Sequence, residues 1–287
     1  MEKTQTYSPV LDIRNFSVVY DVEPPVLAVQ NVALKLGRGE VLGLAGESGC
    51  GKSTLAYGIQ QLLKPPAVIT SGSVTYCDHK GKETDVLGLS KQELKDFRWD
   101  KISMVFQGAM NALNPVMTIG DQLEDVFLTH RPAMSHQQRL SECQELLEIV
   151  GVGADRLKSY PHELSGGMRQ RVMIAMALSL KPQIMVMDEP TTALDVLVER
   201  EILTQISQLR EQFGFSVVFI THDLPLLLEI SDRIAIMKDG VIVELDSASS
   251  IYHHPQHEYT KKLLSSFPSL TGDKGGFVRG TAKASAS

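Results

Sequence analysis

The sequence predicts an α/β fold in which a mostly parallel sheet is joined to an N-terminal antiparallel β subdomain and a helical insert. Short β-branched runs over residues 10–36, separated by Pro24 and Pro25, predict strands joined by a turn. Helical periodicity dominates residues 118–180 and predicts the insert. After the insert, apolar strand-like runs alternate with helical patterns, which is typical of a parallel sheet covered by helices.

The first half of the chain contains a strand that runs directly into a glycine-rich loop. The segment "EVLGLAG" predicts the buried strand, and "KSTLAYGIQQLL" after the loop predicts a helix. Residues 70–100 are expected to be a polar excursion that ends in a short helix, because Ser90 and Glu93 have capping-box spacing. The run "ISMVFQ" then predicts a strand ending at Gln107.

In the second half, Ser135 and Gln138 predict another capped helix, which stops at Gly151. The segments "IMVMDEP" and "SVVFITHD" predict two further strands, each followed by a helix. A final strand pair is expected to turn at Asp239-Gly240.

Composition and charge limit the class of protein. The chain has 287 residues, 43% of them hydrophobic, and a net charge of −6, so it is expected to be globular and not to bind nucleic acid. Cys50, Cys77 and Cys143 lack the short spacings of a metal or disulfide framework and predict reduced thiols. No apolar run approaches the roughly 20 residues needed to span a bilayer.

The same pattern predicts the domain boundaries. Residues 1–9 are expected to be a flexible N-terminus, 10–247 the main α/β domain with its helical part at about 110–180, and 248–270 a C-terminal extension. Residues 271–287 are small and polar and predict a disordered tail.

The glycine-rich loop matches a phosphate-binding pattern at every required position. In "GESGCGKS" these positions are Gly46, Gly51, Lys52 and Ser53. The backbone N–H groups of such a loop converge on phosphates, Lys52 would neutralise them, and Ser53 would bind Mg²⁺. The sequence therefore predicts a P-loop NTPase core that uses ATP and Mg²⁺; the alternative is a Gly-rich turn with an incidental lysine.

Two adjacent acids follow the buried run "IMVM". Asp188 is expected at the carboxyl end of its strand, where α/β sheets bind ligands, and is predicted to hold Mg²⁺. Glu189 is then the candidate base that polarises an attacking water. The alternative is a solvated acidic turn before Pro190.

A second stretch, "LSGGMRQR", opens a helix like a phosphate loop but lacks the lysine. Together with "GESGCGKST", "VFQ", "IMVMDEP", "TALD" and "THD", in this order over about residues 10–247, it resembles the nucleotide-binding subunit of an ATP-binding cassette (ABC) transporter. The resemblance implies that two such subunits close head to tail around ATP. The second stretch would then cap the γ-phosphate held by the other chain, which supplies the lysine.

The resemblance also assigns roles to single residues. Gln107 would reach Mg²⁺ and the attacking water, and His222 would hold the γ-phosphate and orient Glu189. Tyr20 is the expected adenine-stacking aromatic, with an ordinary core residue as the alternative. The complete predicted nucleotide-binding set is Tyr20, Gly46, Ser48, Gly49, Cys50, Gly51, Lys52, Ser53, Thr54, Ser165, Gly166, Gly167 and Asp195.

The segments "FQGAMNALNPVMTIGDQL" and "PQHEYTKKLL" resemble the importer branch that serves dipeptides and oligopeptides, nickel or some oligosaccharides. This implies two permease subunits, a second ATPase subunit, an extracytoplasmic substrate-binding protein and a place on the cytoplasmic face of the cell membrane. Met110, Leu113 and Met117 are expected to line a groove for a permease helix, or else to be ordinary core. The rival functions are an ABC ATPase of DNA repair or translation and a non-catalytic nucleotide-binding regulator.

Overall fold

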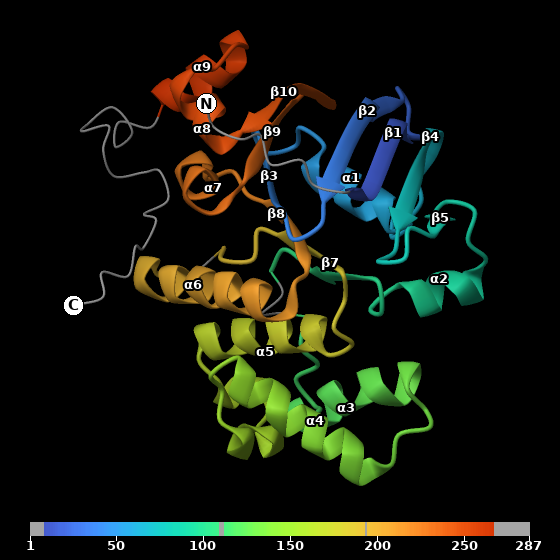
Figure 1. Cartoon of the computed structure of the whole chain (residues 1–287), viewed down its shortest axis with the longest axis vertical. Coiled ribbons are helices and arrows are strands. Elements are labelled where there is room, and N and C mark those ends of the chain that lie inside the picture. The colour runs from blue at the N-terminus through green and yellow to red at the C-terminus, as the bar shows by residue number, and fades with distance from the viewer. Residues whose placement is uncertain (1–8, 109–111, 193, 267–287) are drawn as a thin grey trace.

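The computed structural model describes residues 9–108, 112–192 and 194–266, which form two sheets, a helical insert and a C-terminal pair of helices (Figure 1). The strands are β1 (Pro9–Tyr20), β2 (Val26–Gly37), β3 (Val41–Ala45), β4 (Ala67–Cys77), β5 (Glu83–Asp85), β6 (Ile102–Val105), β7 (Ile184–Asp188), β8 (Ser216–Ile220), β9 (Arg233–Lys238) and β10 (Val241–Ser247). The helices are α1 (Lys52–Ile59), α2 (Lys91–Phe97), α3 (Ile119–His130), α4 (His136–Ile149), α5 (Gly166–Leu178), α6 (Val196–Phe213), α7 (Leu224–Ile230), α8 (Ala248–His253) and α9 (Glu258–Ser265), with 3-10 turns η2 (Ala154–Lys158) and η3 (Pro161–Glu163).

The central sheet has the strand order β10-β9-β3-β8-β7-β6. Its pairings are parallel except for β9 with β10, which form a hairpin through Asp239 and Gly240, both at positive φ. The mostly parallel sheet and the terminal hairpin predicted from the sequence are thus confirmed.

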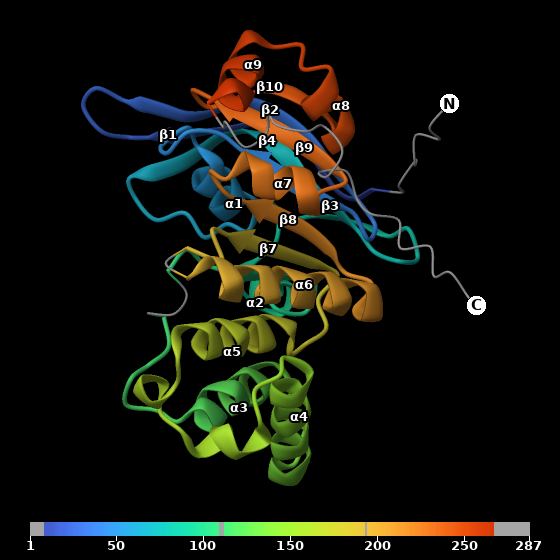
Figure 2. The ribbon, with the colours of Figure 1, turned by 90° about the vertical axis from the view of Figure 1, so that its left-hand side faces the viewer.

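Both faces of the central sheet are buried, which explains its nearly continuous apolar strands. In β7, Met185 and Met187 point to the core shared with α5, α6 and α7. Ile184 and Val186 alternate with them and point to the core shared with α1 and the antiparallel sheet. The central sheet therefore separates two hydrophobic cores (Figure 2).

The antiparallel sheet has the order β2-β1-β4-β5. The expectation that residues 70–100 are a polar excursion was wrong at its start, because β4 and β5 lie in or near this segment and β4 pairs with β1 along most of its length. Only the alternate residues Val74 and Tyr76 of β4 are fully buried, while Thr70, Ser71 and Ser73 lie on partly or fully exposed positions. Because the exposed positions of β4 are mostly polar and small, its sequence lacks the regular apolar alternation by which a strand is recognised.

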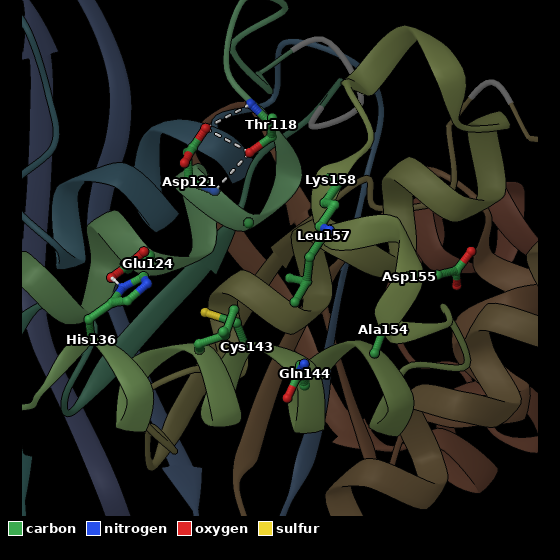
Figure 3. A pocket seen from close by; sticks show the side chains of 12 residues that line it. Thr118, Asp121, Glu124, His136, Cys143, Gln144, Ala154, Asp155, Leu157 and Lys158 are labelled. Atoms are coloured by element: carbon green, nitrogen blue, oxygen red, sulfur yellow. Dashed lines mark hydrogen bonds and ion pairs between the residues drawn. The ribbon is translucent and has the colours of Figure 1, made fainter.

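The helical insert forms the lower part of Figure 1, where α3 and α4 pack beside α5. The predicted capping boxes of Ser90 with Glu93 and of Ser135 with Gln138 are confirmed. Thr118 and Asp121 form a third one at the start of α3, visible in Figure 3.

The segment between β6 and α3 differs from the expectation in two places. Strand β6 ends at Val105, so Gln107 lies two residues beyond it in an exposed turn. Leu113 is buried in the core and does not line a surface groove; Met110 lies outside the described residues. Among the residues of this segment that the structure describes, the most exposed large apolar side chain is Val116, 80% exposed.

The C-terminal extension contains α8, which packs against α7 and the β9–β10 hairpin, and α9, whose start is bonded to Glu244 of β10 (Figure 1). The predicted flexible N-terminus, except Pro9, and the predicted disordered tail lie outside the described residues. Within the part of the chain that the structure describes, no helix is both long and apolar enough to cross a membrane.

Candidate functional site

A loop between β3 and α1 forms the centre of the site. Gly46, Gly49 and Gly51 all have positive φ, at 152°, 80° and 106°. A Cβ atom on Gly46 would lie 2.2 Å from the Met237 carbonyl oxygen, and one on Gly51 would lie 2.2 Å from that of Ala28. Both glycines are required by conformation and by close backbone packing, so the loop is pinned between β2 and the β9 hairpin.

Lys52 begins α1 and folds back over this loop. Its ammonium donates hydrogen bonds to the carbonyl oxygens of Gly46 at 2.7 Å and Glu47 at 2.8 Å. The side chain is almost completely buried. A buried cation held at the N-terminal end of a helix makes the loop attractive to anions.

Asp188 ends β7 with its carboxylate inside the protein. Neither of its oxygens has a hydrogen-bond partner of normal geometry among the described residues, although the residue is fully buried. Burial raises the pKa of Asp188, and the neighbouring Glu189 raises it further, whereas Ser53, Lys52 and Tyr57 oppose the rise. Burying a carboxylate without a partner is costly, and such groups are concentrated at functional sites.

Glu189 has the opposite surroundings. Its carboxylate is contacted by Nδ1 of His222 at 3.1 Å, Nε2 of Gln107 at 3.2 Å and Oγ1 of Thr192 at 3.0 Å. Burial alone would raise the pKa of Glu189, but the hydrogen bonds of His222 and Thr192 and the charge of Lys52 outweigh it and lower the pKa. The residue also has a φ of 46°, a conformation that non-glycine residues adopt rarely.

The three partners of Glu189 come from different elements. Gln107 follows β6, Thr192 follows β7, and His222 follows β8. Because these strands are parallel neighbours, their carboxyl ends lie at one edge of the sheet. The topology thus brings together Gln107, Glu189 and His222.

Tyr20 lies at the end of β1, and its hydroxyl is 3.2 Å from Oγ1 of Thr54 in the first turn of α1. The ring is partly exposed next to the helix that follows the phosphate loop. This position is compatible with an aromatic platform beside a bound nucleotide.

The second predicted cradle lies apart from the first. Ser165 is the N-cap of α5 and accepts a hydrogen bond from the Met168 N–H at 3.2 Å, with Gly166 and Gly167 in the first turn. Asp195 caps α6 by accepting from the N–H groups of Leu197 and Val198. Both views place α5 well away from α1 (Figures 1 and 2), so the structure does not bring these residues to the phosphate loop of their own chain.

Three contacts of the site were missed in the sequence. Thr192 donates to Glu189, Tyr57 lies near Asp188, and Tyr259 of α9 contacts the phosphate loop. The position of Thr192 three residues after Glu189 is a local signal that could have identified it. Tyr57 and Tyr259 have no comparable signal, because their contacts depend on the tertiary fold.

Comparison with known proteins gives a consistent picture. A family model described as ABC transporter matches residues 29–192. The chain is 42% identical over 265 residues to the dipeptide transport ATP-binding protein DppD of Bacillus subtilis (strain 168), covering 91% of this chain and 77% of that protein. It is 39% identical over 275 residues to the glutathione import ATP-binding protein GsiA of Escherichia coli (strain K12), covering 93% of this chain but only 43% of that longer protein.

Solved structures show the same similarity. A dimeric ATP-binding cassette in a post-hydrolysis state, bound to ADP and phosphate, aligns with a TM-score of 0.71 at 32% identity and covers 83% of this chain and 98% of its own. CbiO1 of Clostridium perfringens, part of an ABC transporter complex, aligns with a TM-score of 0.72 at 22% identity, covers 91% of this chain and 97% of its own, and supports the fold alone.

Proposed function

Because the chain belongs to the ABC transporter family and is an ATPase, we propose that it energises uptake of short peptides through separate permease subunits. The observation that carries the catalytic part is the carboxylate of Glu189, which is contacted by side chains from the ends of three parallel strands beside the phosphate loop. A dipeptide transport protein and a glutathione import protein are among its relatives, and glutathione is itself a short peptide. Both names describe transport, which favours an importer over an ATPase of DNA repair or translation.

The phosphate loop would bind the phosphates of ATP. Its N–H groups and the start of α1 provide hydrogen bonds and positive potential, and Lys52 would exchange its bonds to Gly46 and Glu47 for bonds to the β- and γ-phosphates. Tyr20 would stack on the base, and Ser48, Cys50 and Thr54 would complete the loop around the phosphates.

The residues next to the loop fit a magnesium ion. Neither oxygen of the buried Asp188 carboxylate has a hydrogen bond of normal geometry in the described residues, and the Ser53 hydroxyl lies close to the same carboxylate. Hard oxygen donors of this kind suit Mg²⁺. When bound, the ion would offset negative charge on the β- and γ-phosphates. The amide of Gln107, which is bonded to Glu189, could also turn towards it.

Glu189 would orient the attacking water and accept its proton. Its lowered pKa keeps the carboxylate ionised at neutral pH, and Thr192, Gln107 and His222 hold it in one position. Such positioning matters because phosphoryl transfer depends mainly on alignment and charge stabilisation. His222 is 63% exposed and can therefore reach a γ-phosphate on the open side of the site.

We further propose that a second ATPase subunit, identical or homologous, completes each site. Ser165, Gly166 and Gly167 present the start of α5 at a distance from the chain's own phosphate loop, and this positive helix end would cap the γ-phosphate bound by the other subunit. Asp195 would lie at the seam between the subunits. The solved relative that binds ADP and phosphate is dimeric, which supports this arrangement.

The permease is proposed to contact the helical insert. A hollow of about 720 Å³ lies between α3, α4 and η2, with Asp121, Glu124 and Asp155 around it and Leu157 inside (Figure 3). The exposed Val116 lies two residues before Thr118, at the edge of this hollow. The lining also contains His136 and Lys158, and Glu124 is paired with His136 and Arg139, so the surface has mixed charge around an apolar floor. An amphipathic permease segment would match this surface, and it would hold the subunit on the cytoplasmic face of the membrane.

The test is to isolate the assembled complex. Tagged Glu189→Gln protein should bind ATP without turnover and, when added with ATP to detergent-solubilised membranes of its source cell, should co-purify with two permease subunits. A Lys52→Ala control, which should not bind ATP, should recover less of them. Recovery of ribosomal or DNA-repair proteins instead would contradict the transport role.

A second experiment tests the substrate. Addition of the substrate-binding protein and dipeptides to the reconstituted wild-type complex should stimulate ATP hydrolysis. Stimulation by nickel or oligosaccharides alone would contradict the peptide assignment.

A further inference from the structure

The C-terminal extension reaches the phosphate loop directly. The hydroxyl of Tyr259 in α9 accepts a hydrogen bond from the backbone N–H of Glu47 at 3.2 Å. Glu47 is the second residue of the loop, directly after Gly46. The contact joins positions 212 residues apart in the chain, so it arises only because α9 folds over the end of the central sheet.

The Tyr259 side chain is firmly placed. It is 7% exposed, and the ammonium of Lys238 in β9 lies 5.4 Å from the centre of its ring. The start of α9 is fixed from β10, where the Glu244 carboxylate accepts hydrogen bonds from the N–H groups of Gln256 at 2.7 Å and His257 at 3.0 Å. Contacts with β9 and β10 therefore fix the position of the hydroxyl that is bonded to Glu47.

The residue it contacts is also held from the other side. The carbonyl oxygen of Glu47 accepts a hydrogen bond from Lys52 at 2.8 Å. When the Lys52 ammonium moves to a phosphate, Glu47 loses this bond, whereas the bond to Tyr259 does not depend on the lysine. At the other end of the loop, the N–H of Gly240 holds the Cys50 carbonyl at 3.0 Å. Tyr259 is therefore the anchor of the beginning of the loop, as Gly240 is of its end.

We propose that Tyr259 is a positioning residue of the phosphate loop, whose hydroxyl keeps Glu47 in the conformation that directs the loop's N–H groups at the ATP phosphates. The proposal rests on the assignment of this loop to ATP. It gives the C-terminal extension a direct part in nucleotide affinity. Tyr259 itself would touch neither the nucleotide nor the attacking water.

The test is a Tyr259→Phe substitution, which removes the hydroxyl and keeps the ring. Loss of one hydrogen bond that orients the loop should weaken ATP binding by about three- to tenfold. The Kd for ATP and the KM should rise together, while kcat at saturating ATP and the unfolding temperature should stay close to the wild-type values. Tyr76→Phe is the matched control, because the Tyr76 hydroxyl is buried but has no hydrogen-bond partner among the described residues; it should leave the Kd unchanged.

The outcomes separate the possible roles. An unchanged Kd in Tyr259→Phe would overturn the inference, as would a lower kcat at unchanged KM or an equal increase in Kd in Tyr76→Phe. If the wild-type protein itself did not bind ATP, the assignment of the loop would fail, and the inference with it.

Discussion

Asp188 and Glu189 are adjacent in the chain, yet the surroundings of their carboxylates shift the two pKa values in opposite directions. Asp188 is buried without a hydrogen bond of normal geometry in the described structure, and its pKa is raised mainly by that burial, although Ser53, Lys52 and Tyr57 lower it. Glu189 is surrounded by donors, and its pKa is lowered despite its burial. The first carboxylate is therefore held at a cost to stability, whereas the second is stabilised in its ionised form.

This difference predicts a stabilising substitution at the site. A group with a raised folded-state pKa favours folding below its ordinary pKa of 3.8, and this contribution is lost as the pH rises through the folded-state value. At pH 7.5, Asp188→Asn should therefore raise the Tm of the nucleotide-free protein, by about 2–4 °C for each kcal/mol recovered. The gain should shrink as the pH is lowered towards 4, and ATP hydrolysis should be lost.

Thermal unfolding from pH 7.5 to pH 4 measures this, with Glu189→Gln as the matched control. Because the ionised Glu189 is favoured in the folded state, its substitution should not raise the Tm at pH 7.5. A Tm for Asp188→Asn at or below that of the wild type at neutral pH would contradict the cost assigned to Asp188.

Local sequence patterns were sufficient to place Asp188 at the end of its strand and to locate the glycine-rich loop, but they placed Gln107 in a strand that ends two residues earlier. Asp188 directly follows an apolar run, and Gly46 and Lys52 have a fixed spacing, so all three residues could be singled out without knowledge of the fold. Tyr259 could not be found in this way, because its contact with Glu47 requires α9 to fold back over the loop. The roles proposed for the site residues, including Tyr20 and Asp195, stay predictions.

At the scale of single elements, the start of α5 has one observed role and one proposed role. Ser165 caps its own helix through the Met168 N–H, which stabilises the helix. The proposed second role is to present the hydroxyl and the positive helix end to a phosphate of another subunit. Ser90 has only the first role, because it caps α2 in a capping box away from the site.

A pair of cap substitutions can separate these roles. Ser165→Ala and Ser90→Ala should each lower stability by about 1 kcal/mol, since each removes one N-cap side chain. Only Ser165→Ala should also reduce ATP hydrolysis, by about tenfold or more. The measurements are denaturant unfolding and steady-state ATPase rates; an equal loss of activity in both variants would show that α5 contributes stability alone.

The elements differed in how clearly the sequence indicated them. Helix α6 has clear ends in the sequence, because Asp195 caps its start and Gly214 ends it in a left-handed conformation. Strand β4 was missed because its polar exposed side resembles a loop, and its place is set by pairing with β1. Tertiary pairing, and not local preference, determines such a strand.

At the scale of the whole molecule, the two cradles are carried by different parts of the chain. Helix α1 packs into one core and α5 into the other, with the central sheet between them. We therefore expect Glu189→Gln protein to dimerise when ATP is added, moving from 31.6 kDa to about twice that mass in light scattering. Combining it with Ser165→Arg should abolish the dimer but leave ATP binding intact, because the arginine would obstruct the partner's nucleotide and not the chain's own.

Dimers of the double variant would contradict the head-to-tail arrangement. A Glu189→Gln protein that binds ATP and yet stays monomeric would show that the second subunit is a different chain.

We also expect the central sheet to transmit movement between the helices on its two faces. Its β7 side chains alternate between the two cores, so the helices on both faces are attached to one stiff plate. Because a densely packed sheet bends little, we expect a shift of the phosphate loop, at the end of β3, to be transmitted to the helical insert. Closure around ATP would therefore move each subunit as a rigid body. The helical insert, at the far side of the sheet from the antiparallel sheet, would then exert force on the membrane partner.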